Sequence, residues 1–293
     1  MDLSLIAEAV VLGILTGAVY ALMASGLTLI FGVMDIINIA QGAFVVLGAY
    51  LSYVLAQHLH IDLFVGLLIT MPVMFGLGVF VEWAFIRPLK RDRIMLSILV
   101  TYAIAIIIEG LLGRIFSTDL VRLDAWYATR SFNLFGFYIG YIYLFAFLLS
   151  VVLLGALYLI LYRTKFGASL RAATQNRTAA QLIGIDVERV SALTFGIGVA
   201  LTAAGGVAFG ATNSFNPGSH YDLISRLLVI IVLGGMGSLG GALIASFGML
   251  VIEDVTAVVW EPKWSTTVFF ILLVLVLVVR PQGLFGQLAG RKE

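Results

Sequence analysis

GLTLIFGVMDIINIAQGAFVVLGAY, residues 26–50, is an apolar run interrupted by glycines and by a close group of three charged or amide side chains. These three residues are Asp35, Asn38 and Gln41, and Gly42 follows directly. Glycine permits unusual backbone angles and close helix approach, and an unwound turn at membrane depth is tolerated only against protein or a water-filled cavity. The run therefore predicts a broken membrane helix that lines a solute pathway, or a short turn with Asn38 capping the next helix. Both can hold together.

The composition of the whole chain indicates that it is embedded in a lipid bilayer. Of 293 residues, 61% are hydrophobic and 11% are charged, whereas soluble domains carry about 25% charged residues. The net charge of +1 gives no indication of a nucleic-acid partner. Cysteine is absent, which excludes disulfides, thiolate metal sites and cysteine nucleophiles.

Apolar segments of about 20 residues predict an all-α integral membrane protein, a polytopic bundle of eight or nine transmembrane helices. Residues 1–293 are expected to form one transmembrane domain, with broken or re-entrant segments within 20–50 and 230–260. The candidate spans are 5–30, 36–57, 62–86, 94–115, 138–162, 191–212, 223–242, 243–260 and 265–280.

The basic residues predict the orientation, because Lys and Arg stay cytoplasmic in short loops. Twelve of the seventeen fall in the loop 87–93, the segment 163–189 and the tail from Arg280. We therefore expect a cytoplasmic C-terminus and an N-terminus on the opposite side.

The segment 163–189 is the long polar stretch on the basic side, and its pattern is helical. Thr178 followed by Gln181 fits a capping box, Gly184 is placed to end a helix, and Asp186 is placed to start the next span. A short helix with a small-residue face suits docking into a groove of a soluble partner. The alternative is a solvated, positive-inside loop.

Glycines cluster in the second half of the chain, where small residues four apart let helices pack backbone to backbone. Packing alone accounts for most of them. The candidate packing residues are Gly206, Gly210, Gly234, Gly235, Gly237 and Gly241.

The sequence offers no catalytic residues and no metal site. There is no phosphate-binding loop for ATP, and the three histidines, His220 among them, fall in predicted outer loops. The acidic residues lie near predicted span ends, with Glu109 the deepest, and no basic residue lies mid-span. An ion-coupled carrier usually needs buried carboxylates, so the energy for transport is expected from elsewhere.

Four ordered blocks resemble the permeases of branched-chain amino acid ABC transporters. They are the opening run, RTKFGASLRAATQNRTAAQLIGIDVERVSALTFGIG (163–198), VIIVLGGMGSLGGALIASFGMLVIE (229–253) and VVRPQGLFG (278–286). The resemblance implies a non-enzymatic permease subunit in a bacterial inner membrane, without a cofactor of its own. It also implies four kinds of partner: a second related permease, two cytoplasmic ATPase subunits that use ATP, a periplasmic solute-binding protein, and membrane lipid.

The resemblance also assigns roles to residues. It places ATPase coupling within 167–184, and it places the substrate pathway at Asn38, Gln41 and Gly42. The coupling residues it indicates are Arg171, Ala172, Thr174, Ala179, Ala180 and Gly184.

One block departs from the family pattern. Where the family reads N-x-A-H-G-E, this chain has Gln41 in place of His and Ala43 in place of Glu. Amino acids, branched-chain ones first, remain the expected solutes, with urea and short amides as alternatives. The alternative function is a stand-alone secondary transporter or channel, and a membrane-embedded enzyme is a third class.

Overall fold

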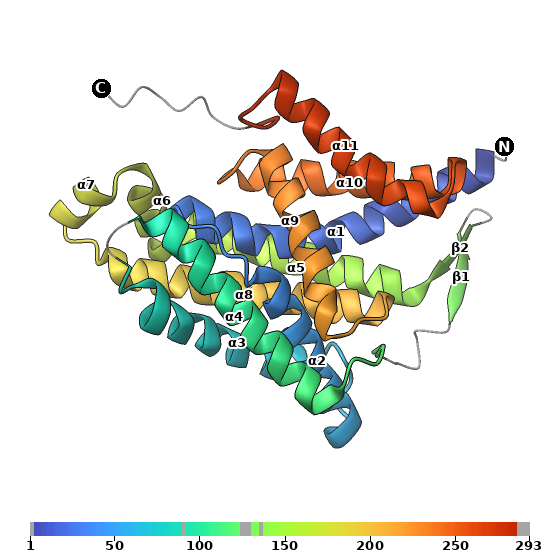
Figure 1. The fold of residues 1–293 in the computed structure, drawn as a ribbon, viewed down its shortest axis with the longest axis horizontal. Helices are drawn as coiled ribbons and strands as arrows, with labels where there is room; N and C mark the ends of the chain where they lie inside the picture. Colours follow the sequence, from blue (N-terminus) through green and yellow to red (C-terminus); the bar gives the residue numbers. More distant parts are fainter. Residues whose placement is uncertain (1–2, 90–91, 124–129, 135–136, 286–293) are drawn as a thin grey trace.

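The described part of the chain is almost entirely helical. The structure, a computed structural model, describes residues 3–89, 92–123, 130–134 and 137–285 (Figure 1). In chain order the elements are α1 (Leu3–Met34), α2 (Gln41–Leu59), α3 (Leu67–Val81), the π-helical η1 (Glu82–Ile86), α4 (Arg93–Phe116), β1 (Ser131–Leu134), β2 (Phe137–Gly140), α5 (Tyr141–Arg163), α6 (Lys165–Gln175), α7 (Arg177–Leu182), α8 (Val187–Thr212), the 3-10 helix η2 (Pro217–Ser219), α9 (His220–Gly234), α10 (Leu239–Val259) and α11 (Pro262–Val279).

Eight helices within the described ranges are long and apolar enough to cross a membrane. They are α1, α2, α3 continued by η1, α4, α5, α8, α10 and α11. The prediction of an all-α, multi-pass membrane bundle is confirmed.

The ninth expected span, 223–242, is a short helix followed by a turn. The helix α9 has 15 residues, about 22 Å at 1.5 Å per residue, which is less than the roughly 30 Å hydrocarbon core of a bilayer. It stops because Gly235 and Gly237 take φ angles of 92° and 83°, which glycine adopts at little cost. The candidate span 223–242 is therefore not a full crossing, and the predicted break within 230–260 is confirmed.

The chain after α11 returns to the end of this short helix. The Leu284 amide donates a hydrogen bond of 2.7 Å to the Leu233 carbonyl. Gly283, with φ +79°, lies so close to Gly235 that a Cβ at Gly283 would be 2.7 Å from the Gly235 nitrogen. A late segment thus satisfies a backbone group that α9 leaves unpaired at its C-terminus.

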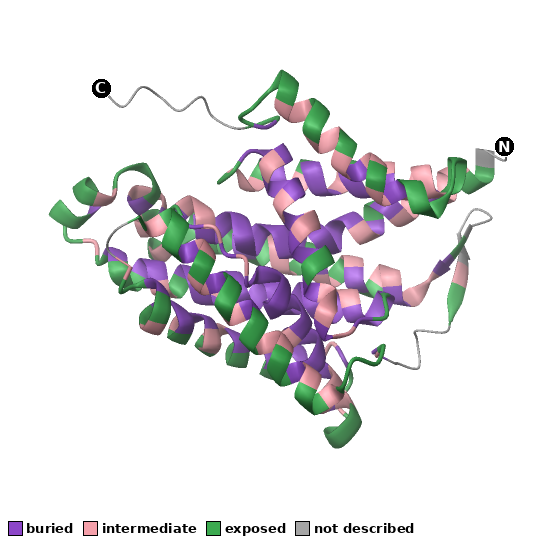
Figure 2. Cartoon of the chain, viewed as in Figure 1, coloured by how far each residue is buried: buried purple, intermediate pink, exposed green. Residues whose placement is uncertain are grey.

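The helix α8 lies at the centre of the molecule. In its most apolar window 78% of residues are buried, against 11% in α11, and Figure 2 shows the same gradient in colour. Small residues allow close packing here: a Cβ on Gly48 of α2 would be 2.6 Å from the Ala203 Cα of α8. The helices α1, α5 and α8 run along the long axis of the molecule, and α9 crosses them (Figure 1).

Candidate functional site

Asn38 and Gln41 lie together, fully buried, at the break between α1 and α2. Asn38 Nδ2 donates to Gln41 Oε1 at 2.8 Å, and Gln41 Nε2 donates to the hydroxyl of Thr202 on α8. The Thr202 hydroxyl donates in turn to the Gly198 carbonyl at 2.8 Å. This chain of hydrogen bonds joins the break to the central helix, and in this conformation it is sealed from solvent.

Asn38 does not cap α2. The N-cap position is Ala40, without a side-chain hydrogen bond, because the Asn38 amide group is turned toward Gln41. The predicted capping role is therefore wrong. Gly42 packs against α9, where a Cβ would meet Ile224 at 3.1 Å, so the start of α2 is pressed onto the start of α9.

The polar segment between α5 and α8 is a pair of short helices. The first, α6, folds back on α5: the Arg171 guanidinium donates to the Leu161 carbonyl and lies 5.2 Å from the centre of the Tyr162 ring. Ala172 is half-buried along the same helix. Arg171 is thus engaged within the chain itself.

The second helix, α7, presents apolar side chains outward. Leu182 is 84% exposed and Ile183 is 75% exposed, whereas Ala180 is only 2% exposed and faces the protein. The residues that the sequence indicated for coupling are therefore divided. Thr174, Ala179 and Gly184 are exposed, and Arg171, Ala172 and Ala180 are partly or fully buried.

Capping residues shape this segment. The Asn176 side chain accepts a hydrogen bond of 2.9 Å from the Ala179 amide and starts α7, so the predicted capping box at Thr178 and Gln181 is wrong. Asn176 comes first in the chain and starts the helix two residues earlier. Gly184 follows α7 with φ +85°, and Asp186 caps α8 through the Arg189 amide at 3.0 Å, both as the sequence predicts.

The candidate packing glycines take three kinds of position. Gly234 of α9 and Gly241 of α10 meet backbone to backbone, and Gly206 meets the backbone of Val45 on α2. A Cβ on Gly210 would be 2.8 Å from the Phe215 ring. Gly235 and Gly237 form the turn after α9 with positive φ angles.

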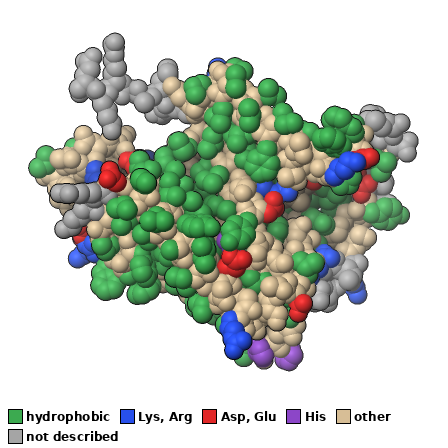
Figure 3. All heavy atoms as spheres, in the orientation of Figure 1, with side chains coloured by type: hydrophobic (Ala, Val, Ile, Leu, Met, Phe, Trp, Pro, Cys, Tyr) green, Lys and Arg blue, Asp and Glu red, His purple; other side chains and the backbone are tan. Residues whose placement is uncertain are grey.

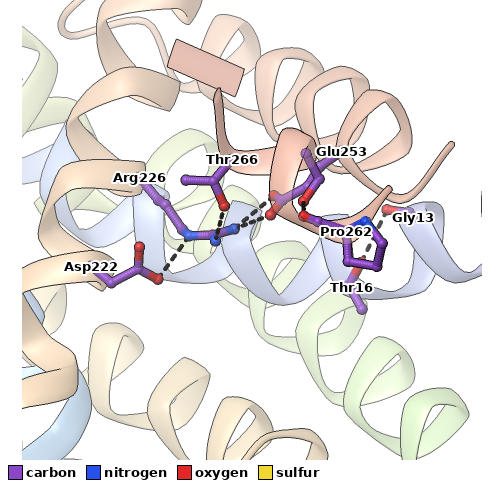
Figure 4. A network of polar contacts seen from close by, with 8 residues as sticks. Gly13, Thr16, Asp222, Arg226, Glu253, Pro262 and Thr266 are labelled. Carbon is purple, nitrogen blue, oxygen red and sulfur yellow. Dashed lines mark hydrogen bonds and ion pairs between the residues drawn. The ribbon is translucent and has the colours of Figure 1, made fainter. Parts of the chain in front are cut away.

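A buried charge cluster joins α9, α10 and α11 (Figure 4). Arg226 Nε donates to Asp222 at 2.8 Å, and Arg226 Nη1 donates to Glu253 at 2.7 Å. The side chains of Arg226 and Glu253 are 15% and 11% exposed. The two partners neutralise each other inside the bundle, a pairing that the sequence pattern alone did not indicate.

His220 also departs from its predicted place in an outer loop. It begins α9, is 2% exposed, and its Nε2 lies 3.0 Å from Glu109 on α4. The Tyr221 hydroxyl donates to the same carboxylate at 3.0 Å. Neither charge cluster is a metal site: across the described ranges, no three His, Asp or Glu side chains gather in a way that could hold a metal ion.

Eight membrane-length helices, breaks at α1–α2 and α9–α10, and a helical projection between α5 and α8 define a polytopic membrane transport protein. The family described as "Branched-chain amino acid transport system / permease component" matches residues 9–277. The chain belongs to this family of transport permeases.

Curated relatives span nearly the whole chain. The high-affinity branched-chain amino acid transport system permease protein BraD of Pseudomonas aeruginosa is 27% identical, over 94% of both chains. The corresponding protein LivH of Escherichia coli (strain K12) is also 27% identical over 94% of both. A probable branched-chain amino acid transport permease of Methanocaldococcus jannaschii is 29% identical, over 90% of this chain and 88% of its own. No solved structure matches the chain.

Proposed function

We propose that this chain is the permease subunit of an ABC importer for branched-chain or similar small amino acids. In this proposal it works beside a second, related permease. A solute-binding protein delivers the amino acid on one side, and two ATPase subunits supply the energy on the other. The permease holds no cofactor of its own. The names of the relatives and the placement of α6 and α7 support this assignment.

The observation that carries the proposal is the outward apolar tip formed by Leu182 and Ile183. Apolar side chains this exposed, on a short capped helix beside basic residues, suit a hydrophobic groove on a soluble partner. The helix α6, which precedes α7, is anchored to α5 through Arg171. A displacement of α7 is therefore transmitted to α5 and α8, because no flexible loop separates them.

The broken helices give the permease two arrangements to move between. ATP binding can favour one arrangement only if the ATPase pair binds the two with different affinity. In this proposal the buried hydrogen bonds of Asn38, Gln41 and Thr202 belong to a closed arrangement. In the open one, we expect these amides to face the solute.

The docking role is tested by Leu182→Asp in the assembled transporter. A charge on the tip should reduce ATPase co-purification and ATP-driven leucine uptake together, by tenfold or more. Val65→Asp is the matched control, because Val65 is also exposed, at 56%, but lies in the turn between α2 and α3. Wild-type co-purification by Leu182→Asp, or an equal loss in Val65→Asp, would refute the docking role.

A further inference from the structure

A cavity with one charged and one apolar wall lies between α1, α5, α8, α9 and α10. Its volume is about 270 Å³, near the lower end, about 300 Å³, of the range usual for small-molecule sites. Figure 3 shows acidic and basic side chains meeting in a depression of this face. The apolar wall includes Leu15, Val19, Phe209 and Leu250.

The charged wall carries more negative than positive groups. Asp222, Glu253 and Asp254 line it, against one guanidinium, that of Arg226. Glu253 is paired with Arg226, and among the described residues Asp254 forms no ion pair with a basic side chain. A surplus of carboxylates in a half-closed space favours a bound cationic group.

The guanidinium of Arg226 retains donor capacity. Its Nε and Nη1 are engaged by Asp222 and Glu253, but the contact of Nη2 is a long one, 3.4 Å to the Thr266 hydroxyl. Asp222 is the loosest partner, with its side chain 58% exposed. A carboxylate entering the cavity could therefore bind Nη2 and replace Asp222 at Nε, in the two-point geometry that guanidinium groups favour.

We propose that this cavity is a binding subsite for a free α-amino acid with an aliphatic side chain. Asp254 and Glu253 take the ammonium group, Arg226 takes the carboxylate, and the wall of Leu15, Val19 and Leu250 takes the side chain. The proposal rests on the proposed function and names where on this chain the solute is recognised. The site requires both charges of the zwitterion.

The test is equilibrium binding of radiolabelled leucine to the assembled transporter in lipid nanodiscs without the solute-binding protein. Asp254→Asn should weaken leucine binding by about tenfold or more, and Asp254→Glu should restore most of it. Glu261→Gln is the matched control, an exposed carboxylate seven residues away that is paired with Lys263 and does not line the cavity. It should bind like the wild type.

Two further measurements separate recognition from mere stability. In the Asp254→Asn transporter, 4-methylpentanoate, which lacks the ammonium group, should compete with leucine several-fold better than it does in the wild type. Asp222→Asn should tighten leucine binding several-fold, because it frees Arg226 for the solute carboxylate. Structural damage would produce neither change.

The outcomes are distinct. Unchanged leucine binding in Asp254→Asn, or weaker or unchanged binding in Asp222→Asn, overturns the subsite. If Asp254→Asn fails to assemble, Asp222→Asn decides by itself. ATP-driven leucine uptake by the complete wild-type transporter is measured in parallel. If the wild-type transporter takes up leucine but the variants bind leucine as the wild type does, the subsite is refuted and the proposed function stands. If the wild-type transporter takes up no amino acid, the proposed function is refuted.

Discussion

The Gln41 side chain donates a hydrogen bond to the Thr202 hydroxyl, which joins the first turn of α2 to the middle of α8. Both residues are fully buried. The chain is not helical between the end of α1 and the start of α2. This hydrogen bond therefore fixes where the helix begins again. Residues indicated for a solute pathway thus also tie α2 to α8 in this conformation.

Replacing Gln41 with Ala should destabilise the permease, because the Asn38 amide would lose its acceptor in a buried place. An unsatisfied buried polar group costs about 1–3 kcal/mol, so we expect a lower thermal unfolding temperature for the purified protein. Thr202→Val removes the other partner. The double variant should be less destabilised than the sum of the two single variants, and strict additivity would argue that the two side chains act independently.

Gly240 and Gly241 form a matched pair on α10. A Cβ at Gly241 would collide with the Gly234 backbone, whereas a Cβ at Gly240 would meet nothing within 4 Å. Gly241→Ala should therefore cost about 1–3 kcal/mol by overpacking and lower the yield of monodisperse protein. Size-exclusion profiles and melting curves of the two alanine variants provide the measurement. Similar behaviour of the two would show that α9 and α10 can separate freely.

Asn176→Ala should loosen α7 without unfolding the membrane body. Loss of an N-cap typically costs about 1 kcal/mol, and a six-residue helix has little else to hold it. Amide hydrogen exchange over 177–182 should become faster and ATP-driven uptake should fall. Asn176→Asp keeps the acceptor and should preserve both, and unchanged exchange in the alanine variant would contradict the role of the cap.

The orientation can be tested by cysteine labelling, since the natural chain has no cysteine. Gln181→Cys on α7 should react with a membrane-impermeant maleimide only after the cells are opened. Lys263→Cys, whose parent side chain is 70% exposed, should react in intact cells. Labelling of position 181 from outside would reverse the proposed orientation and remove the docking role of α7.

The sequence predicted the membrane-length helices well, because a span is decided by local apolar length. It predicted Asp186 and Gly184 well for the same reason, since a cap and a left-handed turn act within four residues of themselves. It failed where two local signals competed. Asn176 and Thr178 are both good caps, and only the structure shows that Asn176 starts the helix.

The charge clusters could not be predicted in full, because their partners are far apart in the chain. Arg226 and Glu253 are separated by 27 residues, and Glu109 and His220 by 111. The four-residue spacing of Asp222 and Arg226 was a usable sign of a helical ion pair. Nothing local shows that α10 brings Glu253 to the same point, so burial of the pair was missed.

The bond between Leu284 and Leu233 has a consequence for how the protein is made. Residue 284 leaves the ribosome only after α10 and α11 have been synthesised. Until then the Leu233 carbonyl at the end of α9 lacks the hydrogen bond that the Leu284 amide donates to it. A bare carbonyl is costly in hydrocarbon. We therefore expect the short helix to stay near the insertion machinery until translation has passed that point.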